Sequence, residues 1–264
     1  MSSDSSEGWQ GWDEYAPFYD WENAQTLGRR DVGFWERAAR SVHGELLELG
    51  CGTGRISIPL ARSGVGVVGI DRSSAMLAHA ASRVERLRRR GVRRSTLPTF
   101  VRGDIRALPF SNARFAMVVA AYGILQSLVR ERDLASTLDS VARVLEPSGV
   151  LGIDLVPDVP NWREYHDRVQ MRGRLRGRRL TLIESVRQDR RRHLTHFAQR
   201  FIVGTGSSAI ERHFDLTFRT LPLPAMMRRL EKAGFVVEST FGGYRGAPWS
   251  PDADTWLILA RRTG

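Results

Sequence analysis

Residues 46–55 read LLELGCGTGR, an apolar run followed by three glycines that alternate with small residues. The run at 46–49 predicts a short buried strand, and the glycines predict a tight turn directly after it. Glycine in such a turn loses conformational entropy on folding, but it permits positive φ angles and close approach of a ligand to the backbone. The stretch therefore predicts a ligand-binding turn at the end of the first strand.

Strands and helices alternate after this turn. Further strands are predicted at 65–71, 99–104, 115–122 and 150–156, with helices at 54–63, 74–90 and 133–145. A last helix at 224–235 and strands at 236–243 and 255–262 would complete the sheet. Continuous β-branched runs separated by helices are typical of a parallel sheet covered on both faces. We therefore predict an α/β fold with a doubly wound, mostly parallel, seven-stranded Rossmann-like sheet.

The pattern changes after the fifth strand, where three consecutive strands without helices are predicted at 180–187, 194–203 and 211–221. In the third of these, Phe214, Leu216 and Phe218 alternate with polar residues, which indicates one buried face. These strands form a predicted antiparallel insertion at 157–222. The arginine-rich segment 168–180 that leads into it is predicted to be either an exposed, mobile connection or a grip for a polyanion. The remaining predicted parts are a disordered tail at 1–8, a helical lid at 9–41, and a core at 42–156 and 223–264.

Composition limits the function classes. The 264 residues suit one large domain or a domain with an insertion, and no apolar run is long enough for a membrane span. We expect a cytoplasmic protein, because the N-terminus lacks a secretory pattern. Cys51 is the only cysteine, so no disulfide and no metal site is predicted. The net charge of +11 suggests a nucleic acid, but Lys232 is the only lysine among 40 basic residues, which indicates a compositional habit instead.

Three carboxylates follow or end predicted strands: Glu48, Asp71 and Asp104. The carboxyl ends of parallel strands meet in one crevice, where ligands of doubly wound sheets bind. An acid that ends the second strand can accept both hydroxyls of a ribose. Two kinds of cofactor with such a ribose must then be distinguished, one that carries a pyrophosphate and one that does not.

The glycine spacing separates these two cofactors. The dinucleotide pattern is G-x-G-x-x-G and must accept a pyrophosphate. Here the pattern is G-x-G-x-G, Arg55 stands where a third glycine would be wanted, and Glu48 would repel a pyrophosphate. A zwitterionic amino-acid tail that carries a sulfonium suits an acidic first strand better.

On these residues the chain resembles the class I S-adenosylmethionine-dependent methyltransferases. The matching segments are ELGCGTG at 48–54, GID at 69–71, GDIRALPF at 103–110 and VLEPSGVLGIDL at 144–155. The insertion and YGILQSL at 122–128 resemble the small-molecule branch, which includes glycine and sugar-amine N-methyltransferases. The resemblance implies S-adenosylmethionine as cofactor, S-adenosylhomocysteine as product, and in-line methyl transfer to N or O of a small molecule.

The resemblance also implies roles for individual residues. The glycines would approach the methionine part and the ribose, Asp71 would hold the ribose hydroxyls, and Asp104 would meet the adenine amino group. The cofactor-binding residues so predicted are Tyr15, Tyr19, Glu48, Gly50, Cys51, Gly52, Gly54, Asp71, Arg72, Met76, Gly103, Asp104, Ile105, Ala121, Tyr122 and Gln126.

Residues on the acceptor side are predicted from their positions beside this site. The aromatic stretch 9–21 is predicted to be a lid whose Tyr15 and Tyr19 close over the sulfonium by cation–π contact, or alternatively a docked helix. Tyr122 and His196 are the predicted catalytic residues. The predicted substrate-binding residues are Trp162, His193, Arg200 and His213.

Other acceptors and functions are weighed against this one. AAYGIL at 120–125 lacks the (D/N/S)-P-P-(Y/F/W) pattern of enzymes that methylate the amino groups of adenine, cytosine or glutamine. Two alternatives stay open: an RNA methyltransferase whose arginine runs at 83–94 and 168–180 track phosphates, and a non-catalytic cofactor-binding module. Glu48 and Arg55 oppose a NAD-dependent oxidoreductase. The sequence does not distinguish a monomer from a dimer.

Overall fold

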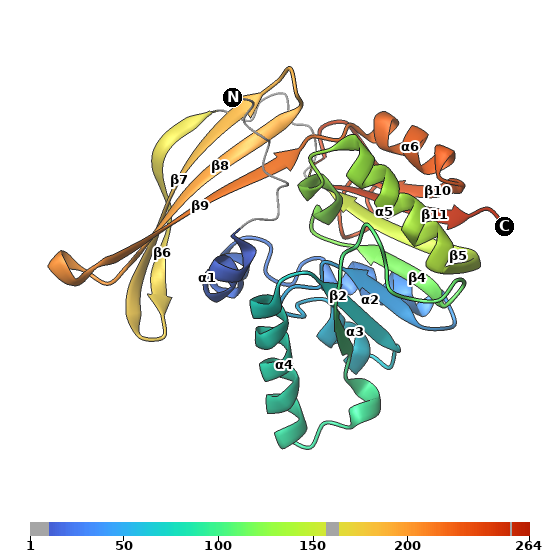
Figure 1. Ribbon diagram of the computed structural model, residues 1–264, viewed down its shortest axis with the longest axis horizontal. Coiled ribbons are helices and arrows are strands. Elements are labelled where there is room, and N and C mark those ends of the chain that lie inside the picture. The colour runs from blue at the N-terminus through green and yellow to red at the C-terminus, as the bar shows by residue number, and fades with distance from the viewer. Residues whose placement is uncertain (1–10, 157–163, 254) are drawn as a thin grey trace.

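The computed structural model describes residues 11–156, 164–253 and 255–264. These residues form a seven-stranded sheet with helices on its faces and a separate four-stranded sheet, and the first helix lies between them (Figure 1). The predicted tail at 1–8 and Trp162 lie outside the described residues.

The large sheet has the strand order β10-β11-β5-β4-β1-β2-β3. Its strands are β1 Leu46–Leu49, β2 Val67–Asp71, β3 Thr99–Arg102, β4 Phe115–Ala120, β5 Leu145–Leu155, β10 Phe235–Phe241 and β11 Trp256–Arg262. Strand β11 is antiparallel to β5 and β10, and the other neighbours are parallel. The predicted doubly wound, mostly parallel fold is confirmed. The order reverses between β1 and β4, which is where such sheets bind ligands.

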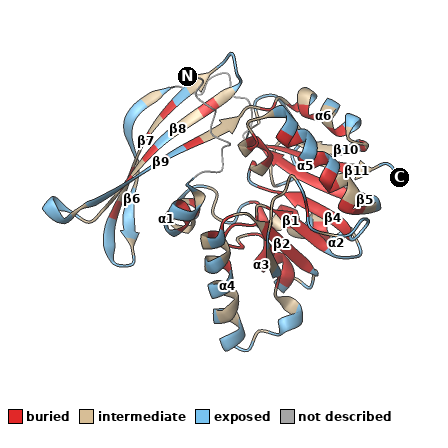
Figure 2. Cartoon of the chain, in the orientation of Figure 1, coloured by how far each residue is buried: buried red, intermediate tan, exposed pale blue. Residues whose placement is uncertain are grey.

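Helices cover both faces of this sheet. The side chains of Leu46 and Val67 pack with α2 (Val32–Arg40) and α3 (Ser57–Arg62), whereas the next residues, Leu47 and Val68, join a core with α5 and α6. Successive side chains of a strand point to opposite faces, so burial of both neighbours means that both faces are covered (Figure 2). The remaining helices of the core are α4 Ser74–Arg89, α5 Glu131–Val144 and α6 Leu223–Lys232, with short turns η1 Arg94–Thr96 and η2 Ile124–Ser127.

The insertion contains four antiparallel strands, not the three predicted. They are β6 Tyr165–Leu175, β7 Arg178–Asp189, β8 Leu194–Val203 and β9 Ile210–Arg219, with the turn η3 Gly206–Ser208. The segment 168–180, predicted as a mobile connection, is β6 and the start of β7. Arg176 and Gly177 both have positive φ, 49° and 81°, and join the two strands in a two-residue hairpin turn. The glycine therefore builds a tight turn and does not provide mobility.

The aromatic stretch near the N-terminus forms α1 (Trp12–Gln25) and docks on the inner face of the insertion. The rings of Phe18 and Phe201 stack with centroids 4.5 Å apart, and Tyr15 meets Phe214 edge-on at 5.2 Å. Tyr15 is only 4% exposed. The structure thus contains the docked helix that was the alternative to a free lid.

Candidate active site

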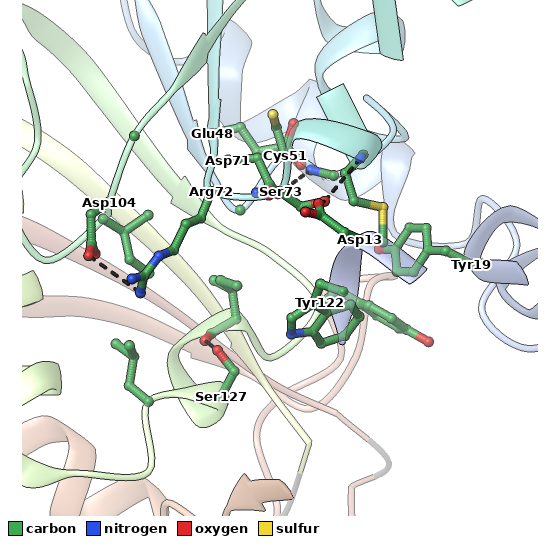
Figure 3. A pocket seen from close by; sticks show the side chains of 18 of the residues that line it. Asp13, Tyr19, Glu48, Cys51, Asp71, Arg72, Ser73, Asp104, Tyr122 and Ser127 are labelled. Atoms are coloured by element: carbon green, nitrogen blue, oxygen red, sulfur yellow. Dashed lines mark hydrogen bonds and ion pairs between the residues drawn. The ribbon is translucent and has the colours of Figure 1, made fainter. Parts of the chain in front are cut away.

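A cavity of about 550 Å³ opens at the carboxyl ends of β1, β2 and β4. Figure 3 shows Glu48, Cys51 and Asp71 at one side of it, and Asp104 paired with Arg72 at another. Of the residues predicted to bind the cofactor, those that line this cavity are Tyr19, Glu48, Gly50, Cys51, Gly52, Asp71, Arg72, Met76, Gly103, Asp104, Ile105, Ala121 and Tyr122. We call it the first cavity.

The glycine turn has left-handed backbone angles at all three glycines, with φ of 60° at Gly50, 52° at Gly52 and 77° at Gly54. L-residues with a side chain rarely adopt such angles, which explains the alternating pattern. A Cβ at Gly54 would lie 2.8 Å from the ring of Phe100, and Gly54 does not line the first cavity. This glycine therefore accommodates packing of the turn against its neighbours, and its contact with the cofactor stays a prediction.

Asp71 is anchored at the end of β2 by two backbone N–H groups. Gly52 donates to its Oδ2 and Ser73 to its Oδ1, both at 2.8 Å. Burial raises the pKa of this carboxyl, although the two N–H donors favour its charged form. Each carboxylate oxygen can accept a second hydrogen bond. Asp71 can therefore accept hydrogen bonds from the hydroxyl groups of a ligand while it keeps both hydrogen bonds to the backbone.

Asp104 is held differently, by arginine side chains. Nη2 of Arg106 lies 2.8 Å and Nη1 of Arg72 lies 3.6 Å from Oδ2 of Asp104. Partial burial opposes its ionisation, but the hydrogen bonds and charges of Arg106 and Arg72 outweigh it and lower its pKa. The carboxylate is thus kept charged at the rim of the first cavity.

The first cavity also has a carboxyl and a guanidinium close to the glycine turn. Glu48 is 4% exposed and accepts a hydrogen bond from the Ser57 hydroxyl, and burial raises its pKa to about 7. Arg55 forms a bidentate pair with the buried Asp31, at 2.6 and 2.8 Å. Its guanidinium carbon lies 5.2 Å from the ring centre of Tyr122. In the sequence, Arg55 served only as an argument against the dinucleotide pattern, and it was not predicted as a site residue.

A second cavity of about 350 Å³ lies beside the first, between α1, the turn after β4 and the inner face of the insertion. Trp12, Tyr19, Tyr122 and Phe218 line both cavities. Tyr122 is 39% exposed although it lies inside the molecule, because its ring borders both spaces. These four aromatic residues form the shared wall.

Tyr122 sits in a turn that a buried carboxylate holds. Its φ is 57°, which is uncommon for a residue with a side chain. The N–H of the next residue, Gly123, donates to Oδ1 of Asp154 at 2.6 Å, and the Tyr244 hydroxyl lies 3.1 Å from Oδ2. Burial raises the pKa of Asp154 to about 6. Asp154 therefore fixes the turn that carries Tyr122.

Two predicted cofactor contacts belong elsewhere. Tyr15 and Gln126 line only the second cavity. The amide of Gln126 donates to the carbonyl oxygens of Val156 at 3.0 Å and Arg219 at 3.1 Å, and its oxygen accepts from the Val156 N–H at 2.8 Å. Gln126 thus ties the turn after β4 to the ends of β5 and β9, and the structure places neither Tyr15 nor Gln126 at the first cavity.

The histidines and the arginine predicted on the acceptor side do not line either cavity. His196 contacts Thr217 at 3.0 Å, and Arg200 lies 3.9 Å from Glu211, all on the outer face of the insertion. His213 lies on the same face, 3.5 Å from Glu211, and His193 is exposed in the turn between β7 and β8. The structure therefore does not bring His196, His193, Arg200 or His213 to either cavity.

Strand alternation explains this placement. In β8 the residues Thr195 and Gln199 line the second cavity, and His196 and Arg200, which directly follow them, lie on the opposite face. The apolar alternation in β9 already marks Phe214, Leu216 and Phe218 as the inner side, which assigns His213 to the outer side. Applied to β8, the same rule would have found Gln199.

Two further findings concern the described residues. In 11–156, 164–253 and 255–264, no group of three histidine, cysteine, aspartate or glutamate side chains is arranged to hold a metal ion. No helix within those ranges is long and apolar enough to cross a membrane.

Comparison with known proteins defines the class. Residues 46–149 match the family model of the methyltransferase domain. This segment runs from β1 to β5 and contains the glycine turn, Asp71 and Asp104. The match confirms the predicted methyltransferase domain for this segment of the chain.

Individual relatives extend over different lengths. The cypemycin N-terminal methyltransferase of a Streptomyces species is 26% identical over 86% of this chain and 87% of its own length. A demethylmenaquinone methyltransferase of Paenarthrobacter aurescens is 32% identical over 61% of this chain and 60% of its own length. Several other curated relatives are covered over 35% to 61% of their length.

A solved structure shares the whole arrangement. It is the S-adenosylmethionine-bound CalS10 of Micromonospora echinaspora, an amino pentose methyltransferase, with a TM-score of 0.64 and 22% identity. The alignment covers 96% of this chain and 92% of that one. At this identity the likeness concerns the fold.

Proposed function

We propose that this protein transfers a methyl group from S-adenosylmethionine, held in the first cavity, to a nitrogen or oxygen of a small molecule held in the second. The observation that carries the proposal is the shared wall of Trp12, Tyr19, Tyr122 and Phe218. It puts two ligand-sized spaces in contact, and each volume is in the range of small-molecule sites.

The first cavity fits the cofactor group by group. Asp71 offers two anchored acceptor oxygens for ribose hydroxyls. Glu48 and Arg55 present opposite charges suited to an ammonium and a carboxylate, the two ends of an amino acid. Met76 and Ile105 supply apolar surface for an adenine ring. Arg55 also has a buried Nε without a partner among the described residues, which a ligand carboxylate could satisfy.

The cofactor supplies a methyl carbon that an acceptor lone pair can attack in line with the bond to sulfur. The protein contributes position and exclusion of water, which can supply much of the rate of such a displacement. Tyr19 and Tyr122 enclose the junction between the cavities, and Asp154 holds the Tyr122 turn rigid. A side-chain base is required only for an acceptor that arrives protonated.

The second cavity favours a small acceptor over RNA. It lies under the insertion, lined by α1 and the inner strand faces. The arginine runs lie elsewhere, on α4 and on the hairpin of β6 and β7. The relative that acts on a peptide N-terminus and the structural neighbour that acts on an amino pentose also support a compact acceptor.

The test follows a labelled methyl group. The protein is incubated with methyl-labelled S-adenosylmethionine and a bacterial lysate, which is then separated into small molecules, protein and nucleic acid. We expect label in the small-molecule fraction. Label in nuclease-sensitive material would instead favour an RNA methyltransferase whose arginine runs bind phosphates. Cofactor binding without methyl transfer in repeated extracts would favour a regulatory module.

Asp71→Ala tests the cofactor assignment directly. Loss of the two acceptor oxygens should weaken S-adenosylhomocysteine binding by about 10- to 100-fold, the equivalent of about 1–3 kcal/mol. Calorimetric titration measures this change, with Asp215→Ala on the outer face of the insertion as the charge-matched control. Unchanged affinity in Asp71→Ala contradicts the assignment.

A further inference from the structure

The second cavity contains two glutamates from distant parts of the chain that share one amide. Gln199 on β8 donates through Nε2 to Oε1 of Glu22 at 3.1 Å and to Oε2 of Glu184 at 2.8 Å. The Tyr15 hydroxyl donates to Glu22, and the Tyr165 hydroxyl donates to Glu184. We call Glu22, Glu184, Gln199 and the two tyrosines the acidic cluster. All five line the second cavity.

Among the described residues, neither glutamate of the acidic cluster forms an ion pair, although Arg168 lies 5.5 Å from the ring centre of Tyr165. Within those residues each glutamate accepts from tyrosine and glutamine, and Glu184 is 8% exposed. Arg219 also lines the cavity. Its Nη2 pairs with Glu131, and its buried Nη1 has no hydrogen-bond partner among the described residues. Burial, and then the charge of Glu184, raise the pKa of Glu22 to about 7. In a chain with 40 basic residues, an acidic site without an arginine partner is open to a cationic ligand.

Two buried amide oxygens provide an independent indication of a ligand. Asn23 and Gln199 are each 4% exposed and line the second cavity. Oδ1 of Asn23 and Oε1 of Gln199 have no hydrogen-bond donor among the described residues. A buried acceptor without a donor costs free energy, so these atoms favour a ligand that donates hydrogen bonds. Asn23 follows Glu22 in α1, and its Nδ2 donates to the carbonyl oxygen of Tyr19 at 3.1 Å.

We propose that the acidic cluster binds the methyl acceptor through a primary or secondary amine, held between Glu22 and Glu184. This inference rests on the proposed function and deepens it, because it selects nitrogen over oxygen. An ammonium has donors and no acceptor, and the cluster with Asn23 offers acceptors. A carboxylate or phosphate acceptor would be repelled.

Methyl transfer to an ammonium also requires a base, and we assign this role to Glu22. An ammonium has no lone pair, so it must lose a proton before it can attack a methyl carbon. Glu22 takes that proton on its carboxylate and becomes neutral, and the amine keeps the electron pair of the broken N–H bond. After attack, the nitrogen carries the positive charge again and the sulfur has received the electrons of its bond to the methyl carbon. The proton on Glu22 leaves to solvent when the product departs.

The other residues that line the second cavity indicate the size and polarity of the part of the acceptor that carries the amine. Phe197, Leu216 and Phe218 present apolar side chains from β8 and β9, and Met171 does so from β6. Tyr19 and Tyr122 lie at the junction with the first cavity. The acceptor should therefore be an amine on a ring or short aliphatic frame, of a size that about 350 Å³ admits.

The test compares amines with uncharged and anionic probes of equal shape. The protein is saturated with S-adenosylhomocysteine and titrated calorimetrically at pH 7 with cyclohexylamine, 2-phenylethylamine and glucosamine. The matched probes are cyclohexanol, 2-phenylethanol, glucose and cyclohexanecarboxylate. At least one amine should bind 10-fold or more tightly than its hydroxyl counterpart, and the carboxylate should not bind.

Proton release supplies a readout that does not depend on activity. At pH 7 a carboxyl with a pKa of about 7 is about half protonated, and the complex needs only one proton between the amine and Glu22. Binding should therefore release about half a proton, which titrations in buffers of different ionisation enthalpy measure. Glu22→Gln should abolish the release, and Glu184→Gln should weaken amine binding at least 10-fold. Glu211→Gln on the outer face should change neither.

The outcomes separate the two proposals. Equal binding of amine and alcohol, preference for the carboxylate, or absence of saturable binding by all three amines overturns the amine assignment. In each of those cases S-adenosylhomocysteine still binds, so the proposed function stands. If S-adenosylhomocysteine itself fails to bind, the proposed function is lost. Cooperative unfolding of the two glutamine variants, at melting temperatures no lower than that of the parent, verifies that they are folded.

Discussion

The two cavities are built in different ways. In the first, the anchoring contact between Gly52 and Asp71 joins residues 19 positions apart and uses a backbone N–H. In the second, the contact between Gln199 and Glu22 joins side chains 177 positions apart. The first cavity is therefore encoded in a short local pattern, whereas the second depends on how the insertion folds back onto α1. Cofactor recognition and acceptor recognition can consequently vary independently.

Electrostatics also differ between the cavities. In the first, Asp71 is anchored by backbone donors, and Arg55 is matched by Asp31. In the second, the described residues that donate to Glu22 and Glu184 are neutral. A paired site is stable in the absence of ligand, whereas an unmatched acidic site gains most when a cation arrives. Removal of a charged side chain from the first cavity should therefore lower the free energy of unfolding. Removal of a glutamate charge from the second cavity should raise it.

The largest effect is expected for Arg55→Met. This change leaves Asp31, which is 0% exposed, as a buried charge without its bidentate partner. The free energy of unfolding should fall by about 3–5 kcal/mol, the usual loss when one member of a buried ion pair is removed. Urea unfolding followed by circular dichroism measures it.

Arg88→Met is the matched control for that change. Arg88 pairs with Glu85 at 3.3 Å, and both side chains are exposed. An exposed pair contributes about 0–1 kcal/mol, so this variant should unfold almost as the parent does. A loss below about 1 kcal/mol in Arg55→Met would show that Asp31 finds another partner and would remove the contrast between the cavities.

Glu22→Gln should have the opposite sign and depend on pH. Glu22 faces Tyr15 on its own helix, Glu184 and Gln199 on the insertion, and Tyr122 after β4. Its folded pKa of about 7 lies above the unfolded value of 4.5, so folding favours the protonated form. The penalty is absent below pH 4.5, grows as the pH rises, and is complete above about pH 7. Above that pH the variant should be more stable by about 3 kcal/mol.

Thermal or urea unfolding from pH 4 to pH 8 measures this difference, with Glu211→Gln as the exposed control. The parent and Glu22→Gln should converge at the acid end of the range. A constant difference across the range would mean that Glu22 titrates normally in the folded protein, and the second cavity would lose its electrostatic distinction.

Local patterns in the sequence predicted the large sheet well. The run at 46–49 is β1 without any shift of its bounds, and the carboxylates at or just after the ends of β1, β2 and β3 line one cavity. These features need only the period of a strand and the rule that parallel strands end at one edge. The hairpin at 168–180 was missed because its arginines suggested exposure, although a strand whose outer face meets solvent tolerates them.

The second cavity could not be predicted in the same way. Glu22 was one polar residue in an aromatic helix, and Glu184 was one residue in a predicted strand. Nothing in either segment shows that the other lies beside it, because their contact requires the pairing of β7 with β8 and the docking of α1. Histidines were predicted as site residues because imidazoles can act as bases. The alternation of side chains along β8 and β9 places His196 and His213 on the outer face.

Tyr122→Phe should have the smallest effect, and it tests the wall that both cavities share. The variant keeps the ring next to Arg55 and loses only the hydroxyl, which bonds Thr26. With the acceptor identified by methyl labelling, we expect kcat to fall by about 5- to 10-fold, while S-adenosylhomocysteine affinity stays within about twofold. Tyr244→Phe is the matched control, since its hydroxyl bonds Asp154 and it lines neither cavity. That control should lower stability with little change in kcat. If Tyr122→Phe, like Tyr244→Phe, lowers stability with little change in kcat, the Tyr122 hydroxyl contributes only to stability. The junction of the cavities would then contribute to catalysis only through its shape.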